Sequence, residues 1–465
     1  MKSNYISEEN ILLQKEYCAK IRGLDFPGSK PSYYLETYGC QMNIRDAETV
    51  AGFFEEMGFI SANCMESADI IFFTTCCIRD HAEKKLMANI GALKERKDAN
   101  PALMICIGGC MMQRPGVAEK IMRRFPFVDA AIGTNSLWRL PQTISSILEG
   151  NRVIDTAEYD FSICEGMPVK HSSTVSAFVN IMYGCDNFCS YCIVPYVRGR
   201  ERSRNPEHIL NEVRSLAAQG ISEITLLGQN VNSYGNGSDC DFPSLLRSVN
   251  EVDGLRRIRF MTSHPKDLSS KLVDAMAESE KVCHHLHLPV QSGSNRILKE
   301  MNRKYTAEQY LAKVSLLRQS MPDIEITTDI IVGFPGETEE EFQDTLELVR
   351  TVGYSSAFTF KYSPRAGTRA ASMEGQIPED IKKERLARLN ALQAEMTKNS
   401  NAKYISSVAE VLVEGADFKQ SVLLHGRLGN FKAVYFEGSA VLVNSYCNVK
   451  ITSCSNNSLT GELVL

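Results

Sequence analysis

The sequence predicts an α/β protein built from three parts: an N-terminal open α/β domain, a central partial (β/α)6 barrel and a small C-terminal all-β barrel. Two successive rhythms of short apolar strands and amphipathic helices predict the first two parts, because strands that alternate with helices form parallel sheets. Short strands separated by Gly and Asn turns predict the third part. A chain of 465 residues has room for two or three such domains.

The N-terminal domain is expected over residues 31–150, after a polar, loosely attached extension over residues 1–30. Its strands are short apolar runs, and its helices carry one apolar face. A polar stretch over residues 151–174 is the expected linker to the next domain. The expected strands are 33–38, 69–74, 102–107 and 128–132, and the expected helices are 45–57, 79–96, one after Pro115 and one that ends near Glu149.

The central domain is expected over residues 175–403 and the C-terminal barrel over residues 404–465. Six strands are fewer than the eight that close a (β/α)8 barrel, so the sequence predicts an open one. The C-terminal strands, at 408–414, 421–427, 431–436 and within 438–451, predict an autonomous module. The central strands are expected at 177–183, 223–227, 257–261, 285–289, 325–332 and 356–361, with helices that include 206–219, 307–319, 339–351 and a long charged helix over 378–403.

Composition and charge exclude several classes of protein. A hydrophobic fraction of 43% and a charged fraction of 23% are typical of a soluble globular protein, and a net charge of −5 gives no global basic field. Any contact with RNA must therefore come from local patches. Fifteen cysteines without a secretory leader or a run of roughly 18 apolar residues predict metal or redox chemistry in the cytoplasm, with no disulfides and no membrane anchor.

The CxxxCxxC triplet formed by Cys185, Cys189 and Cys192 is the most informative motif of the chain. Thiolates hold iron–sulfur clusters, and three ligands on a four-iron cluster leave one iron open to a substrate or cofactor. Zinc sites of the CxxC type come as two pairs, and no second close pair follows here. The alternative is three structural thiols in a buried turn, which the polar residues between the cysteines disfavour.

A second set of cysteines is marked by position rather than by spacing. Cys40, Cys76 and Cys110 each follow an expected strand of the N-terminal domain. Ligand sites of open α/β sheets lie at the carboxyl ends of the strands, so three thiols at that edge can converge on a second cluster. The alternative is that each is a buried cysteine with a purely structural role, since cysteine is common in protein interiors.

These motifs carry a resemblance to a known family. The triplet, with Tyr191 before its last cysteine, resembles the radical S-adenosylmethionine (radical SAM) enzymes. The TYGCQMN, TTC and GGC segments around the second set resemble the N-terminal domain of the methylthiotransferases, and the C-terminal module resembles the RNA-binding TRAM domain. The resemblance covers about residues 31–465. The chain has Cys77 where the family usually has serine, so Cys77 is a competitor of the aligned ligand Cys76.

The resemblance implies two [4Fe-4S] clusters and SAM as cofactors. The cluster on Cys185, Cys189 and Cys192 would cleave SAM, the cluster on Cys40, Cys76 and Cys110 would carry sulfur, and a second SAM would supply the methyl group. An electron donor and a sulfur donor are implied as partners of a monomeric enzyme. No catalytic residue is implied beyond the cluster ligands. The residues implied to line the SAM pocket are Tyr191, Gln229, Gln291 and Val332, although many radical SAM enzymes have Glu in place of Gln229.

Segments 192–204, 228–234 and 262–265 resemble the members that add a methylthio group to carbon 2 of N(6)-isopentenyladenosine at position 37 of tRNA. Other members act on threonylcarbamoyl-adenosine in tRNA or on a ribosomal-protein aspartate, and these remain alternatives. A third alternative, from another class, is a non-enzymatic RNA-binding iron–sulfur protein that senses redox state. Four cations are expected to contact the tRNA anticodon stem-loop: Arg198 and Arg200 after the triplet, and Arg427 and Lys432 around a Gly-Asn turn beside Phe431.

Overall fold

The computed structural model describes residues 5–26, 30–77, 80–156, 162–417 and 422–464. The chain forms two compact units. The first comprises Met1–Ser172, Met182–Asp186 and Ile193–Arg204, and the second comprises Ser173–Ile181, Asn187–Cys192 and Asn205–Leu465. Within the described ranges, every helix is too short or too polar to span a bilayer.

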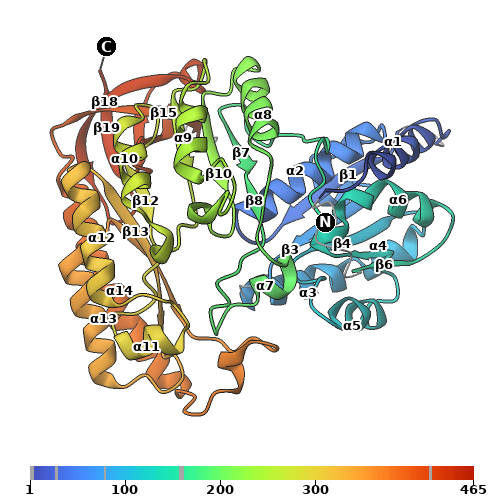
Figure 1. Ribbon diagram of the computed structural model, residues 1–465. Coiled ribbons are helices and arrows are strands. Elements are labelled where there is room, and N and C mark those ends of the chain that lie inside the picture. Colours follow the sequence, from blue (N-terminus) through green and yellow to red (C-terminus); the bar gives the residue numbers. More distant parts are fainter. Residues whose placement is uncertain (1–4, 27–29, 78–79, 157–161, 418–421, 465) are drawn as a thin grey trace. The chain divides into compact units, whose positions relative to one another are not determined.

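The first unit contains a parallel sheet of six strands in the order β2-β1-β3-β4-β5-β6. Figure 1 labels β1, β3, β4 and β6 of this sheet. The chain runs from β1 to β2 on one side and then returns to β3 on the other side of β1. The β1–β3 boundary is therefore a topological switch point, where open α/β sheets bind ligands. The strands are β1 (Ser32–Thr37), β2 (Ile60–Ser61), β3 (Ile70–Thr75), β4 (Met104–Gly109), β5 (Ala130–Ile132) and β6 (Val153–Asp155).

Helices cover both faces of this sheet because successive side chains of a strand point to opposite faces. Ile70 and Phe72 pack in the core beneath α1 (Glu8–Arg22), α2 (Gln41–Glu56) and α6 (Leu140–Leu148). Ile71 and Phe73 pack in the core on the other face, beneath α3 (Asp80–Ala92) and α5 (Val117–Arg124). The open α/β architecture expected for the N-terminal domain is confirmed.

The structure corrects two expectations at the borders of this domain. The N-terminal extension is not loosely attached, because α1 begins at the N-cap Ser7 and buries Cys18 and Ile21 in the sheet core. The stretch over residues 151–174, expected as the linker, supplies β6, and its Lys170 N–H donates to the Glu48 carbonyl. The helix expected over residues 79–96 is divided into α3 and α4 (Lys94–Ala99), and its first residue lies outside the described ranges.

The second unit begins with the partial barrel that the sequence predicts. Two parallel three-stranded sheets, β11-β10-β7 and β12-β13-β14, are linked by a bridge between Ile258 and Val282. The strands are β7 (Ser176–Asn180), β10 (Glu223–Leu227), β11 (Arg257–Phe260), β12 (His285–His287), β13 (Glu325–Val332) and β14 (Ser356–Lys361). Helices between and after them are α8 (Pro206–Ala218), α9 (Phe242–Asn250), α10 (Ser270–Glu278), α11 (Asn295–Glu300), α12 (Ala307–Ser320), α13 (Glu339–Val352) and α14 (Glu379–Ala402).

The C-terminal part of this unit is a closed five-stranded barrel in the order β15-β16-β17-β19-β18. The strand expected within residues 438–451 is β18, which begins at Tyr446 after a 3-10 turn over Ala440–Leu442, whereas the sequence pattern missed β19. Ser421, where one expected strand begins, lies outside the described residues. The strands are β15 (Val408–Ala416), β16 (Leu423–Leu428), β17 (Ala433–Glu437), β18 (Tyr446–Cys454) and β19 (Leu459–Leu463).

The turn between β16 and β17 packs against the amino-terminal ends of the partial-barrel strands. Arg259 donates to the carbonyls of Leu428 (2.8 Å) and Gly429 (2.7 Å). The Phe431 ring stacks on His285 with centroids 5.5 Å apart and an interplanar angle of 17°. Burial, reinforced by the Arg259 charge, lowers the pKa of His285 to about 3, so the stacked imidazole is neutral. The C-terminal barrel thus has an apolar core of its own and also packs on the partial barrel through this turn.

Candidate functional site

The second cysteine set lies at the switch point of the first unit. Cys40, Cys76 and Cys110 follow the carboxyl ends of β1, β3 and β4, which are neighbours in the sheet. Gly39 has φ +133°, and a Cβ there would lie 2.9 Å from the Cβ of Cys76. Glycine therefore lets the loop that carries Cys40 approach the loop that carries Cys76 more closely than another residue allows.

The thiols of this set lie in a buried environment that contains one cation. Cys76 and Cys110 are buried, and burial raises the pKa of Cys40. Arg198 donates from Nε to Cys110 Sγ at 3.2 Å and from Nη2 to Asp46 Oδ2 at 2.6 Å. The Cys77 thiol and then the Arg198 guanidinium lower the pKa of Cys110 to about 7. A thiol in such surroundings is predisposed to ligate as the thiolate.

These residues offer thiolates, the ligand type that iron–sulfur clusters take. Within the described ranges, no three His, Cys, Asp or Glu side chains are close enough together to hold one metal ion. A cubane takes a separate thiolate on each ligated iron, so its ligands need not converge on one point. Three thiols at one edge of the sheet, beside a buried guanidinium, suit an anionic cluster with soft thiolate ligands.

The CxxxCxxC segment follows β7, and its last part is fixed by segments that follow β12 and β14. The Ser190 N–H donates to the Met301 carbonyl at 3.0 Å, and the Ser190 carbonyl accepts from the Ala370 N–H at 2.8 Å. Asn302 Nδ2 donates to the carbonyls of Asn187 (3.1 Å) and Phe188 (3.0 Å). Backbone hydrogen bonds and the Asn302 side chain thus hold this part of the loop.

Arg303 lies beside this loop as a buried cation. Its Nη1 lies 3.4 Å from Cys189 Sγ, its Nη2 donates to the Pro289 carbonyl, and its Nε donates to the Tyr305 hydroxyl. Arg303 is only 4% exposed, and no carboxylate pairs with it in the part of the chain that the structure describes. Because a buried charge requires compensation, this position fits the negative charge of a thiolate-ligated cluster.

The residues implied to bind SAM differ in their burial and in whether their polar atoms have hydrogen-bond partners. Gln291 is buried after β12, has φ +72°, and its Oε1 has no hydrogen-bond partner. Gln229 follows β10 and Tyr191 precedes Cys192, and both are partly exposed. Val332 ends β13 with its side chain fully buried, and its carbonyl accepts from the Tyr362 N–H. Gln291 is therefore the member of this group that presents an unsatisfied polar atom.

Sequence reasoning did not assign three further polar groups at the same ends of the barrel strands. The buried atoms Asn232 Oδ1, Ser263 Oγ and His264 Nε2 lack hydrogen-bond partners and follow β10 or β11. Buried polar atoms are almost always satisfied, so these atoms are available to a polar ligand at this end of the barrel. These residues lie in the segments 228–234 and 262–265, which the sequence analysis used only for their resemblance to the family and not for the ligand-binding chemistry of their side chains. Together with Gln291 Oε1, these atoms fit a zwitterionic, hydroxyl-rich ligand such as SAM.

The structure contradicts two of the four expected RNA contacts. Arg198 is buried against Cys110 and Asp46, and Lys432 Nζ is buried between Glu325 (3.5 Å), Ser400 and Asn401. Alternating cations in a loop predict a solvated surface. Here both side chains are buried, because each pairs with a carboxylate that is distant in the sequence.

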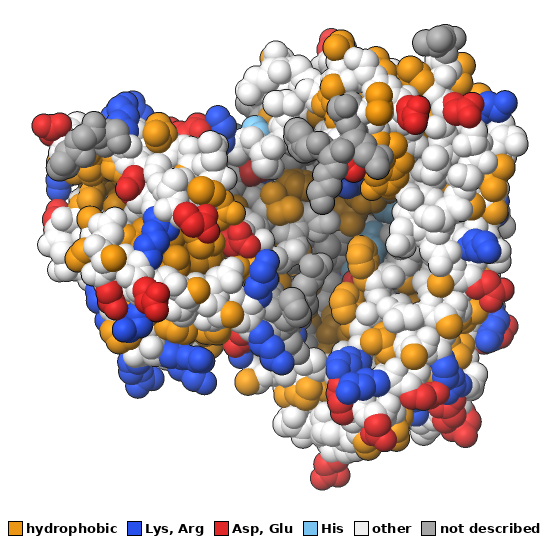
Figure 2. Space-filling view, turned by 180° about the vertical axis from the view of Figure 1, so that it is seen from behind, with side chains coloured by type: hydrophobic (Ala, Val, Ile, Leu, Met, Phe, Trp, Pro, Cys, Tyr) orange, Lys and Arg blue, Asp and Glu red, His pale blue; other side chains and the backbone are white. Residues whose placement is uncertain are grey.

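The other two cations remain accessible. The Arg200 side chain is 72% exposed beside Asp186, and Arg427 pairs with Glu414 and lies over Phe431. Figure 2 shows acidic and basic side chains interspersed over the face in view, which agrees with the absence of a global basic field in the composition. Any electrostatic contact with RNA is therefore local.

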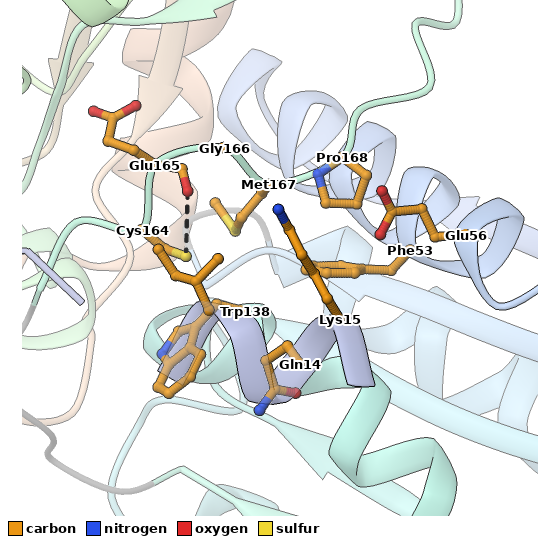
Figure 3. Close-up of a pocket in the computed structure, with 11 residues that line it drawn as sticks. Gln14, Lys15, Phe53, Glu56, Trp138, Cys164, Glu165, Gly166, Met167 and Pro168 are labelled. Carbon is orange, nitrogen blue, oxygen red and sulfur yellow. Dashed lines mark hydrogen bonds between the residues drawn. The ribbon is translucent and has the colours of Figure 1, made fainter. Parts of the chain in front are cut away.

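A small pocket of the first unit lies apart from these residues. It is lined by side chains of α1, α2 and the 164–168 segment, with Trp138 and Met167 in its wall (Figure 3). Cys164 Sγ lies 3.9 Å from the Glu165 carbonyl there, and burial raises the pKa of Cys164 to about 12. None of the cysteines of the two sets lines this pocket, so it is not part of the candidate site.

Three family descriptions match segments of the chain. The radical SAM superfamily matches residues 179–349, Uncharacterized protein family UPF0004 matches residues 32–133, and the TRAM domain matches residues 402–464. Among solved structures, the radical SAM methyltransferase TsrM from Kitasatospora setae has a similar fold, with a TM-score of 0.53, 15% identity and coverage of 74% of each chain. The cobalamin-dependent radical SAM enzyme OxsB has a TM-score of 0.51 at 13% identity, over 83% of this chain and 61% of OxsB.

Curated relatives are much more similar in sequence. The tRNA-2-methylthio-N(6)-dimethylallyladenosine synthase of Caldicellulosiruptor saccharolyticus is 51% identical over 94% of this chain and 93% of its own length. The synthase of the same name from Clostridium novyi is 49% identical over 93% of this chain and 96% of its own length. Identity at this level over nearly the whole of each chain shows that the protein belongs to the tRNA-2-methylthio-N(6)-dimethylallyladenosine synthase family of radical SAM enzymes.

Proposed function

We propose that this protein is a radical SAM methylthiotransferase that adds a methylthio group to carbon 2 of N(6)-dimethylallyladenosine in tRNA, at position 37 next to the anticodon. The observation that carries this proposal is the presence of two separate three-cysteine sets, each with a buried arginine at one sulfur. An enzyme that only cleaves SAM needs one such set. The names and lengths of the relatives support the same reaction and the same substrate.

The chain's own residues would divide the work. Cys185, Cys189 and Cys192 would hold one [4Fe-4S] cluster, and the set of Cys40, Cys76 and Cys110 would hold a second. With SAM bound, these groups supply the radical and sulfur chemistry that an unreactive aromatic C–H bond requires. Arg303 would compensate the charge of the first site and hold Cys189. Gln291 would orient SAM through its unsatisfied Oε1. An electron donor and a sulfur donor are required as partners.

The inner face of the partial barrel supports an apolar modification on the substrate. Phe358 and Phe360 of β14 pair with Asp329 and Ile331 of β13, whose side chains share the inner face with His287. Both rings are large and exposed, at 53% and 41%. Exposed aromatic side chains on a concave polar wall favour an apolar ligand. A dimethylallyl group suits them, whereas a threonylcarbamoyl group would bring a second carboxylate beside Asp329.

Replacement of both rings, Phe358→Ala with Phe360→Ala, is expected to raise KM for a dimethylallylated anticodon stem-loop about tenfold or more. Loss of apolar contact of this size costs on the order of 1–3 kcal/mol of binding. Steady-state kinetics with the modified stem-loop measures the effect. Thr359→Ala is the matched control, because Thr359 lies between the two rings but hydrogen-bonds Asn390 of α14. An unchanged KM in the double variant would assign the prenyl group to another surface.

Contact with the remainder of the tRNA is proposed for Arg200 in the first unit and, separately, for Arg427 and the exposed Tyr435 on the paired strands β16 and β17 of the second unit. Cations contact phosphates, and an exposed aromatic ring suits the unpaired, splayed bases of an anticodon loop. Because phosphate contacts release counterions, this binding should weaken as salt concentration rises.

The decisive test is mass spectrometry of tRNA nucleosides from cells that lack the protein and from the same cells complemented with it. Loss of 2-methylthio-N(6)-dimethylallyladenosine, with accumulation of N(6)-dimethylallyladenosine, is the expected result. Loss of a methylthiolated threonylcarbamoyl nucleoside, or of methylthio-aspartate in a ribosomal protein, would assign the protein to the corresponding relative. Unchanged nucleosides and no SAM binding under anaerobic conditions would favour a redox sensor.

A further inference from the structure

We propose that Arg198 is a positioning residue that hydrogen-bonds a ligand sulfur and raises the reduction potential of the cluster on Cys40, Cys76 and Cys110. This inference rests on the proposed function, because it requires that the second cysteine set hold a cluster. Arg198 is assigned to this role by its contacts in the first unit and not by the basic run in which it stands.

Arg198 is buried at the end of a helix that is held in place by its neighbours. It is the last residue of α7 (Val194–Arg198) and is 6% exposed. Thr134 Oγ1 donates to the Val197 carbonyl at 2.8 Å, and Val197 packs in one buried cluster with Ile193, Cys77 and Cys110. The helix end that carries the guanidinium is thus fixed by both a hydrogen bond and apolar packing next to the cysteines.

The direction of the guanidinium distinguishes a tuning role from a structural ion pair. Arginine–carboxylate pairs frequently form two parallel N–H···O bonds. Here only Nη2 donates to Asp46, at 2.6 Å, and Nε donates to Cys110 Sγ, at 3.2 Å. One N–H that is available for the carboxylate is therefore directed to sulfur. This geometry places Asp46 as the residue that orients Arg198 toward the thiol.

Such a contact changes the energy of electron transfer. A reduced cluster carries one more negative charge than the oxidised cluster, and a donor or a cation close to a ligand sulfur stabilises that charge. The effect is strong because the surroundings are buried and screen charge weakly. Lysine has a single point charge on a flexible stem and cannot contact sulfur and carboxylate in the same planar arrangement. Arg198 should therefore raise the potential, and Asp46 should lower it.

The experiment uses the full-length chain with Cys185, Cys189 and Cys192 replaced by Ala, so that only the second set can hold a cluster. After anaerobic reconstitution, the reduced fraction is followed by electron paramagnetic resonance during a redox titration. Arg198→Gln should decrease the ratio of reduced to oxidised cluster about tenfold at a fixed potential, which is a shift of about 59 mV for one electron. Asp46→Asn, which removes a negative charge, should shift the potential in the opposite direction.

Arg139→Gln is the control, because Arg139 forms a partly buried ion pair with Asp155 in the same unit. It should leave the potential unchanged, and Arg198→Lys should give a partial shift. If Arg198→Gln loses iron, the opposite shifts of Asp46→Asn and Arg198→Lys still decide the question. Equal potentials in all variants, or shifts of one sign, would overturn the role of Arg198 alone. No iron in the parent triple variant would overturn the second cluster as well.

Discussion

Removal of the residues after Ile405 is expected to prevent stable folding of the partial barrel. The Arg259 side chain is 2% exposed and Glu223 is 6% exposed, and they pair at 3.1 Å beneath the turn that caps them. Truncation would strip Arg259 of two carbonyl acceptors and His285 of its stacked ring. Each lost buried partner costs about 1–3 kcal/mol, so several together approach the total stability of about 5–15 kcal/mol of a typical protein.

The measurement is the soluble yield and the apparent Tm of the truncated and full-length proteins, followed by anaerobic SAM cleavage. Phe431→Ala in the full-length chain is expected to lower the apparent Tm in the same direction and by a smaller amount. Tyr435→Ala, on the exposed face of the next strand, should leave it unchanged. A truncated protein that remains soluble and cleaves SAM at the full rate would show that the turn contributes little to the fold.

Replacement of Cys76 by alanine is expected to reduce methylthio transfer below detection while SAM cleavage continues. Cys76 lies against the Gly39 turn that carries Cys40, whereas Cys77 contacts the Cys110 thiol and packs in the apolar cluster with Ile193 and Val197. Cys77→Ala should therefore retain the product. The proposed function assigns radical cleavage to the other three cysteines, so formation of 5′-deoxyadenosine is the internal control, and methylthiolated nucleoside is the readout.

Iron content gives an independent check on the two sites. The intact protein should bind about eight irons after reconstitution, four in each cluster, and either triple cysteine variant should retain about half. Loss of all iron, or of none, in one triple variant would contradict two independent sites. Loss of product in Cys77→Ala with retention in Cys76→Ala would reverse the assignment of the third ligand.

The sequence alone predicted that the second cysteine set follows neighbouring strands at one edge of the N-terminal sheet. Strand periodicity fixes where β1, β3 and β4 end, and parallel topology makes those ends neighbours, so Cys40, Cys76 and Cys110 were expected together. Helix α1 was missed because only Gln14, Cys18 and Ile21 among its residues are buried, too few for a clear apolar period.

Local sequence patterns could not predict that two of the expected RNA-binding cations are buried. Arg198 and Lys432 lie in segments whose sequence predicts solvated loops. Each is buried because it pairs with a carboxylate far away in the sequence: Arg198 with Asp46 and Lys432 with Glu325. Phe431 read as a stacking surface for RNA, but it occupies φ +75° and stacks on His285. In all three cases the position of the side chain is set by a partner far away in the sequence, and the periodicity of the sequence carries no information about such a partner.

The packed turn between β16 and β17 also limits how this chain can be recombined. In a chimera that takes its C-terminal barrel from a relative, the new turn would meet Arg257, Arg259, His285 and Glu325 at the starts of three strands of the recipient. The smallest interchangeable piece is therefore larger than the barrel itself. It includes those strand starts, so a boundary drawn at the end of α14 would divide one folding unit in two.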